Sequence, residues 1–233
     1  MKVESFDIDC LGYKLDADYY DNGGDKVLLS LIGWTSEKGR YKDILEGICR
    51  RTGMDALVFD YSGHGTSKFP IEKTRPAQHF LEVICAYDWL KENRPGKEIV
   101  VMGASYGGYM AALLSQHRPV SRQVIRAPGL YKPEDFYSYA PDWRKDTLYE
   151  YRQNPKLVEA NQLFEDAKSY KGRTLVVVHE KDEQIPRVVT DAYIKAFDAD
   201  VYLAEGLMHS FGVNPPRGKV ERYQEAISEW LKK

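Results

Sequence analysis

The chain has 233 residues, of which 43% are hydrophobic and 29% charged, and its formal net charge is −2. This composition is typical of a soluble globular protein and excludes a largely disordered chain. The near-balanced charge argues against a basic nucleic-acid-binding face, and no apolar run approaches the roughly 18 residues that a membrane helix needs.

The N-terminus and the cysteines favour a cytoplasmic protein. Residues 1–7 lack the apolar core of a secretory leader, so we expect no export. Cys10, Cys49 and Cys85 are odd in number and widely spaced, which fits neither a disulfide framework nor a metal site. We therefore expect small, buried, unpaired thiols in a reducing compartment.

Strand and helix patterns alternate through most of the chain. Half-buried strands are predicted at 2–10 and 13–21, followed by a strand at 27–32, a helix at 37–51, a strand at 56–59 and a helix at about 76–93. Next come a strand at 99–102, a helix at 106–117 and a strand at 123–125, and later a strand at 175–178, a helix at 186–197, a strand at 201–203 and a helix at 217–232. The central strands are continuous apolar runs. This pattern predicts a mostly parallel sheet of about eight strands, buried on both faces by helices.

Residues 129–172 interrupt the alternation. They hold many charges, three prolines and two short helical patterns, near 142–152 and 155–168. The segment is too short for a core of its own, so we expect an insertion within a single domain that spans 1–233. Six of the 17 tyrosines of the chain fall in it, together with Phe136 and Trp143.

A sharp turn around Ser105 carries the clearest chemical signal. Residues 103–108 read Gly-Ala-Ser-Tyr-Gly-Gly, the G-x-S-x-G pattern, between a predicted strand and a predicted helix. Gly103 and Gly107 lack a β-carbon, which allows neighbouring chain to approach a strained turn closely. The serine would then lie above the carboxyl ends of the strands, where the start of the helix favours developing negative charge.

With this turn the whole sequence resembles the α/β-hydrolase family. Ile32-Gly33-Trp34 ends the third strand, where the family usually has a His-Gly pair, and residues 60–67 (DYSGHGTS) resemble its D-x-x-G-x-G-x-S loop. The insertion stands where the family carries its cap. The Ser-Tyr-Gly-Gly variant is similar to that of prolyl-oligopeptidase-like and small feruloyl-esterase-like members.

The resemblance implies a general base and an orienting acid for Ser105. Among the five histidines, His64 lies in a glycine turn, His79 and His117 are predicted on helix surfaces, and His179 ends a strand. The family order Ser…Asp…His selects His209, which follows the last strand. 

Three carboxylates compete for the role of the acid. Asp182 stands shortly before Ile185-Pro186, as the family's acid usually does, and Glu183 and Glu180 are the alternatives.

The resemblance also implies an oxyanion hole formed by the backbone N–H groups of Trp34 and Tyr106. Ile32 replaces the histidine that usually braces this loop, which puts its rigidity in question. The aromatic residues Trp34, Tyr131, Phe136 and Tyr137 are candidates for lining an acyl pocket. The alternative is that Trp34 simply packs in the core and that the rings of the insertion attach it to the sheet.

These features predict a serine esterase that forms an acyl-enzyme from small or aromatic acyl esters. The alternatives are a peptidase or aminopeptidase of the prolyl-oligopeptidase-like type, a thioesterase or acyltransferase, and a non-catalytic binding protein on the same scaffold. No metal site, phosphate loop or dinucleotide fingerprint is present, so we expect no cofactor. The expected partner is a small-molecule ester, rather than nucleic acid or a membrane.

Overall fold

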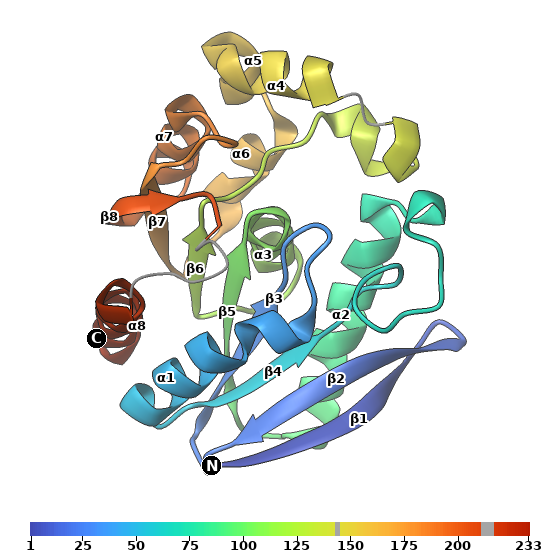
Figure 1. Ribbon diagram of the computed structural model, residues 1–233, viewed down its shortest axis with the longest axis vertical. Coiled ribbons are helices and arrows are strands. Elements are labelled where there is room, and N and C mark those ends of the chain that lie inside the picture. The colour runs from blue at the N-terminus through green and yellow to red at the C-terminus, as the bar shows by residue number, and fades with distance from the viewer. Residues whose placement is uncertain (143–144, 211–216) are drawn as a thin grey trace.

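The described residues form one eight-stranded sheet. The computed structural model describes residues 1–142, 145–210 and 217–233, and its strands lie in the order β1-β2-β4-β3-β5-β6-β7-β8 (Figure 1). They are β1 (Lys2–Cys10), β2 (Tyr13–Asp21), β3 (Lys26–Leu31), β4 (Asp55–Phe59), β5 (Glu98–Ala104), β6 (Arg122–Arg126), β7 (Arg173–Lys181) and β8 (Asp200–Met208). The pairs β1–β2 and β2–β4 are antiparallel and the others are parallel, which confirms the predicted sheet.

Helices cover both faces of this sheet. They are α1 (Lys42–Thr52), α2 (Pro76–Asn93), α3 (Tyr106–His117), α4 (Lys145–Gln153), α5 (Pro155–Glu159), α6 (Gln162–Asp166), α7 (Arg187–Ala196) and α8 (Arg217–Lys232). Short 3-10 helices are η1 (Lys38–Tyr41), η2 (Ile71–Lys73), η3 (Pro133–Phe136), η4 (Ala140–Asp142) and η5 (Ala167–Ser169). Figure 1 shows α1 beside α8 on one face, with α2 and α3 on the other. None of the described helices combines the length and apolarity needed to cross a bilayer.

The core lies along the central strands. Leu28 on β3 is in register with Ala56 on β4 and Val100 on β5, and all three side chains are completely buried. Burial on both faces explains why these strands are apolar at successive positions instead of alternating. The parallel strands from β3 to β8 also end at one edge of the sheet, which brings the loops that follow them together.

Helix α2 buries side chains that its apolar pattern did not predict. His79 was predicted at the helix surface, whereas His79 and Glu82 are fully buried and the apolar Leu81 is 47% exposed. This part of the prediction was wrong because buried polar groups are stable when they are hydrogen-bonded, and both side chains are.

The insertion after β6 folds into short helical pieces at one end of the molecule (Figure 1). One helix was predicted at 155–168, but Ala160 and Asn161 separate α5 from α6, and the backbone of Asn161 is extended. Its side chain caps α6 by accepting from the N–H of Leu163, which favours a new helix start over continuation. Trp143 lies outside the described residues.

The cysteine prediction needs correction at two positions. Cys10 and Cys85 form a disulfide that joins the end of β1 to α2, with their Cα atoms 5.7 Å apart. Their separation of 75 residues gave no sign of this contact, since it arises only when α2 packs against the edge hairpin. Cys49 is buried and unpaired, as predicted.

Candidate active site

Ser105 occupies a strained turn between β5 and α3. Its φ is 52° and its ψ −113°, a conformation that costs free energy for a residue with a β-carbon. A β-carbon on Gly103 would collide with the backbone of Gly107, and one on Gly107 would collide with the carbonyl of Leu31. The two glycines therefore allow the turn to fit tightly against β3 and α3.

Neighbouring strands hold this turn in place. The N–H of Ser105 donates to the carbonyl of Arg126 at 2.9 Å, and the Ser105 carbonyl accepts from the N–H of Gly129 at 2.9 Å. Arg126 ends β6, the sheet neighbour of β5, and Gly129 lies in the loop that follows. These hydrogen bonds offset part of the cost of the strained backbone.

Ser105, His209 and Asp182 form one hydrogen-bonded chain. Ser105 Oγ lies 2.8 Å from His209 Nε2, and His209 Nδ1 lies 3.0 and 2.9 Å from the two carboxylate oxygens of Asp182. The side chains of His209 and Asp182 are only 9% and 6% exposed. The three residues come from the ends of β5, β8 and β7, so the parallel sheet brings together positions more than 100 residues apart in sequence.

The environment of Asp182 favours its charged form. Burial by itself would raise the pKa of the carboxyl, but hydrogen bonds from His209 and from the backbone N–H groups of Ile185 and Gln184 outweigh burial and lower the pKa. A carboxylate requires the facing imidazole nitrogen to carry a proton. This arrangement leaves Nε2 of a neutral His209 as the acceptor for the Ser105 hydroxyl.

The competing carboxylates have other partners. Glu183 accepts from the backbone N–H of His209 at 3.1 Å, and Glu180 accepts from the N–H of Gly206 at 2.6 Å. Both therefore support the backbone around His209. Among the three candidate acids, only Asp182 contacts the imidazole of His209.

A second buried histidine lies beneath the loop of His209. His179 Nδ1 is 2.7 Å from the carbonyl of Met208, and its Nε2 is 3.2 Å from the hydroxyl of Tyr223, which also accepts from Arg126. Burial, followed by the charge of Arg126, lowers the pKa of His179 to about 4. Neutral His179 thus donates to Met208, next to His209. The sequence signalled none of these partners, which come from β6, β8 and α8.

The proposed oxyanion residues lie beside a buried aromatic cluster. Trp34 is half-buried and packs against Tyr106, His64 and His79, at centroid distances of 5.3, 5.0 and 5.9 Å. The N–H of Gly33 donates to the hydroxyl of Tyr41 at 2.8 Å. Nothing in the sequence indicated this hydrogen bond, which reaches the loop that lacks the usual histidine.

The remaining candidates for substrate contact are placed in the insertion. Tyr131 is buried, and its ring packs against Tyr106 and Tyr109. Phe136 packs against Phe80, and Tyr137 is 70% exposed. These contacts attach the insertion to α2 and α3, whereas contact with a substrate stays a prediction.

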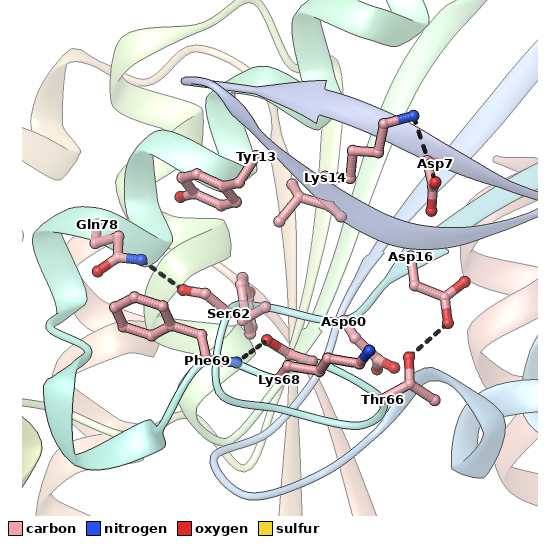
Figure 2. Close-up of a pocket in the computed structure, with 13 residues that line it drawn as sticks. Asp7, Tyr13, Lys14, Asp16, Asp60, Ser62, Thr66, Lys68, Phe69 and Gln78 are labelled. Atoms are coloured by element: carbon pink, nitrogen blue, oxygen red, sulfur yellow. Dashed lines mark hydrogen bonds and ion pairs between the residues drawn. The ribbon is translucent and has the colours of Figure 1, made fainter.

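A pocket of about 430 Å³ lies away from Ser105, between β2 and the loop after β4 (Figure 2). Its walls include Tyr13, Ser62, Phe69 and Gln78, and none of the three hydrogen-bonded residues lines it. Figure 2 shows the Gln78 amide pointing at the Ser62 hydroxyl, a contact of 2.6 Å. The pocket therefore borders Ser62, whose carbonyl contacts His79 of the aromatic cluster.

Solved structures share the fold along nearly the full chain. The esterase Pf2001 of Pyrococcus furiosus aligns with a TM-score of 0.72 and 20% identity, over 99% of this chain and 92% of its own. Est1E of Butyrivibrio proteoclasticus, solved with ferulic acid bound, gives 0.74 and 20%, over 97% of both chains. A monoacylglycerol lipase of Paleococcus ferrophilus gives 0.72 and 19%, over 94% of this chain and 99% of its own.

No curated protein matches the sequence. The family model described as "Serine aminopeptidase, S33" matches residues 24–154, more than half of the chain. These residues include the turn of Ser105 and the loop of Trp34. The chain thus belongs to this serine aminopeptidase S33 family of hydrolases and has the α/β-hydrolase fold.

Proposed function

We propose that this protein is a serine hydrolase that cleaves carboxylic esters through an acyl-enzyme. The observation that carries the proposal is the unbroken chain of hydrogen bonds from Ser105 through His209 to Asp182. A nucleophile, a base and an orienting acid within hydrogen-bonding distance are what acyl transfer requires.

The proposed reaction uses each atom of this chain. His209 Nε2 accepts the proton of Ser105 Oγ while the oxygen bonds to the acyl carbon, and the carbonyl electron pair moves to its oxygen. As the tetrahedral intermediate collapses, the protonated His209 returns the proton to the leaving alcohol. Water then attacks the acyl-enzyme by the same route, which releases the acid and restores Ser105. Asp182 holds the imidazole tautomer and stabilises its cation.

The backbone N–H groups of Trp34 and Tyr106 would stabilise the oxyanion. Tyr106 begins α3, and Trp34 follows β3, the neighbour of β5 in the sheet. Removal of one oxyanion donor typically costs about 3 kcal/mol of transition-state stabilisation.

Replacement of the nucleophile tests the proposal. Ser105→Ala should abolish hydrolysis of p-nitrophenyl acetate and labelling by a fluorophosphonate, with losses in kcat approaching about a million-fold. Ser115→Ala on the same helix is the matched control, because it removes a buried hydroxyl whose partner is the carbonyl of Ala112. Turnover by Ser105→Ala at the rate of the control would contradict the proposal.

Aminopeptidase activity is the second candidate function. It is favoured by the family description "Serine aminopeptidase, S33". We place ester hydrolysis first because the aligned structures over nearly the whole chain are named as esterases and a lipase.

A further inference from the structure

The oxyanion loop lacks the brace that the family resemblance led us to expect. Ile32 is fully buried and has no polar side-chain group, so it provides no hydrogen bond to the loop. Oxyanion catalysis nevertheless depends on donors that are already oriented before charge develops. Other residues must therefore hold Trp34 and Tyr106 in place.

His79 connects both segments of the proposed oxyanion hole. Its ring packs against the indole of Trp34, and its Nδ1 lies 2.8 Å from the hydroxyl of Tyr106. Its Nε2 lies 3.0 Å from the carbonyl of Ser62. A carbonyl only accepts, so Nε2 carries the proton and Nδ1 accepts from Tyr106.

Burial keeps His79 in this neutral form. The side chain is fully buried, and burial, followed by repulsion from nearby His64, lowers the pKa of His79 to about 3. The tautomer that binds Ser62 and Tyr106 is therefore stable throughout the neutral pH range.

Glu82 fixes the other end of this network. Its fully buried carboxyl accepts from the Ser62 N–H at 3.0 Å and from the Ser62 hydroxyl at 2.5 Å. Tyr13 donates to it at 2.6 Å. Ser62 is thus held between Glu82 and His79, at the wall of the pocket in Figure 2.

We propose that His79, supported by Ser62 and Glu82, is a positioning residue that orients Tyr106 and Trp34 for oxyanion stabilisation in place of the missing histidine. The inference rests on the proposed ester hydrolysis. Its physical basis is a network of buried hydrogen bonds that joins α2, the loop after β4 and the start of α3. Hydrogen bonds that are shielded from water are stronger, and a fully paired network restricts the movement of the groups it joins.

The test compares Tyr106→Phe, His79→Phe and the double variant. Tyr106→Phe removes only the hydroxyl, so it keeps the test available if His79→Phe folds poorly. Rates are expressed per site titrated with a fluorophosphonate, which corrects for any unfolded fraction. Tyr109→Phe is the matched control, because Tyr109 is a buried tyrosine on the same helix whose ring packs against Tyr131.

We expect each single variant to lose about tenfold in kcat for p-nitrophenyl acetate while KM changes less than about twofold. The kcat of the double variant should be no more than about twofold below that of a single variant, because each substitution removes the same hydrogen bond between His79 and Tyr106. Phenylboronic acid, which forms a tetrahedral adduct with Ser105 Oγ, should bind about tenfold more weakly to the variants. Tyr109→Phe should match the wild type.

Wild-type kcat and boronate affinity in Tyr106→Phe, or fully additive losses in the double variant, would overturn the inference and leave the proposed function intact. A wild-type protein that neither hydrolyses esters nor reacts with the fluorophosphonate would overturn both.

Discussion

Asp182 and Glu183 are adjacent carboxylates with different partners. Asp182 contacts the imidazole of His209, whereas Glu183 contacts the backbone N–H of His209. A side-chain contact controls the tautomer and charge of the imidazole, while a backbone contact controls where the loop lies. The two residues should therefore affect catalysis very differently.

We predict that Asp182→Asn lowers kcat by about four orders of magnitude, because an amide no longer stabilises the imidazolium cation. Glu183→Gln should retain most of the activity, since its amide oxygen still accepts from His209 N–H. The measurement is kcat for both variants with one p-nitrophenyl ester. Equal losses of kcat in the two variants would contradict the assignment of Asp182 as the residue that orients His209.

The buried histidines couple stability to pH. Burial lowers the pKa of His64. It also lowers the pKa of His79 to about 3 and the pKa of His179 to about 4. At His79 and His179, the unfolded chain binds protons below about pH 6.5, whereas the folded chain binds them only near these lowered pKa values. The contribution of these histidines to the free energy of unfolding is therefore fully present above pH 6.5 and is lost as the pH drops toward 4.

His79 and His179 each contribute a slope of up to about 1.4 kcal/mol per pH unit in this range. We predict that urea unfolding at pH 7.5, 6 and 5 shows this loss and that His79→Phe reduces its slope. A free energy of unfolding that stays constant between pH 6.5 and 5 would show that these side chains are not buried in the neutral form.

At the scale of elements, α2 joins the edge hairpin to the proposed site. The same helix carries Cys85, linked to Cys10 on β1, and His79, bonded to Tyr106. Glu82 adds a third link, to Tyr13 on β2. The disulfide thus restrains the helix that carries His79.

We predict that the unreduced, denatured protein titrates with one free thiol, from Cys49, and the reduced protein with three. Cys10→Ser should lower the free energy of unfolding by about 2–4 kcal/mol, as for other disulfides that close long loops. The double variant Cys10→Ser/Cys85→Ser should have nearly the same free energy of unfolding as Cys10→Ser, since both variants lack the same disulfide. Three reactive thiols without reductant would contradict the disulfide.

At the scale of the whole molecule, buried contacts hold together the pieces of the insertion, and the ring of Tyr131 packs it against α3. Asn161 donates to the carbonyl of Tyr131 at 2.9 Å and to the hydroxyl of Tyr151 at 2.8 Å. Arg152 donates to the carbonyl of Leu130 and lies over the ring of Tyr131. A segment held this closely to α3 favours a confined acyl site over an open one.

We predict faster hydrolysis of acetate, butyrate and cinnamate p-nitrophenyl esters than of the decanoate, measured as kcat/KM. A small or aromatic acyl group fits beneath such an insertion, whereas a ten-carbon chain needs a long groove. A higher kcat/KM for the decanoate than for the other esters would contradict a confined acyl site. Aminoacyl-arylamides belong in the same panel, because their faster cleavage would favour the aminopeptidase alternative.

The sequence by itself determined the alternation of strands and helices and the turn of Ser105, and with the family resemblance it selected His209 and Asp182. Apolar periodicity and glycine spacing are local properties, and the order of the three residues along the chain follows from the family resemblance. Gly103 and Gly107 occur where the backbone must approach closely, so this turn is visible in the residue types alone.

Only the tertiary structure decided which polar residues are buried and what they bind. His79 and Glu82 look like surface residues on an amphipathic helix. The hydrogen bonds of Tyr41 and Tyr223 and the Cys10–Cys85 disulfide have no local signature. Their partners lie on other elements, and burying a polar side chain is favourable only when such a partner exists. That pairing is a property of packing, which exists only once the sheet and its helices have come together.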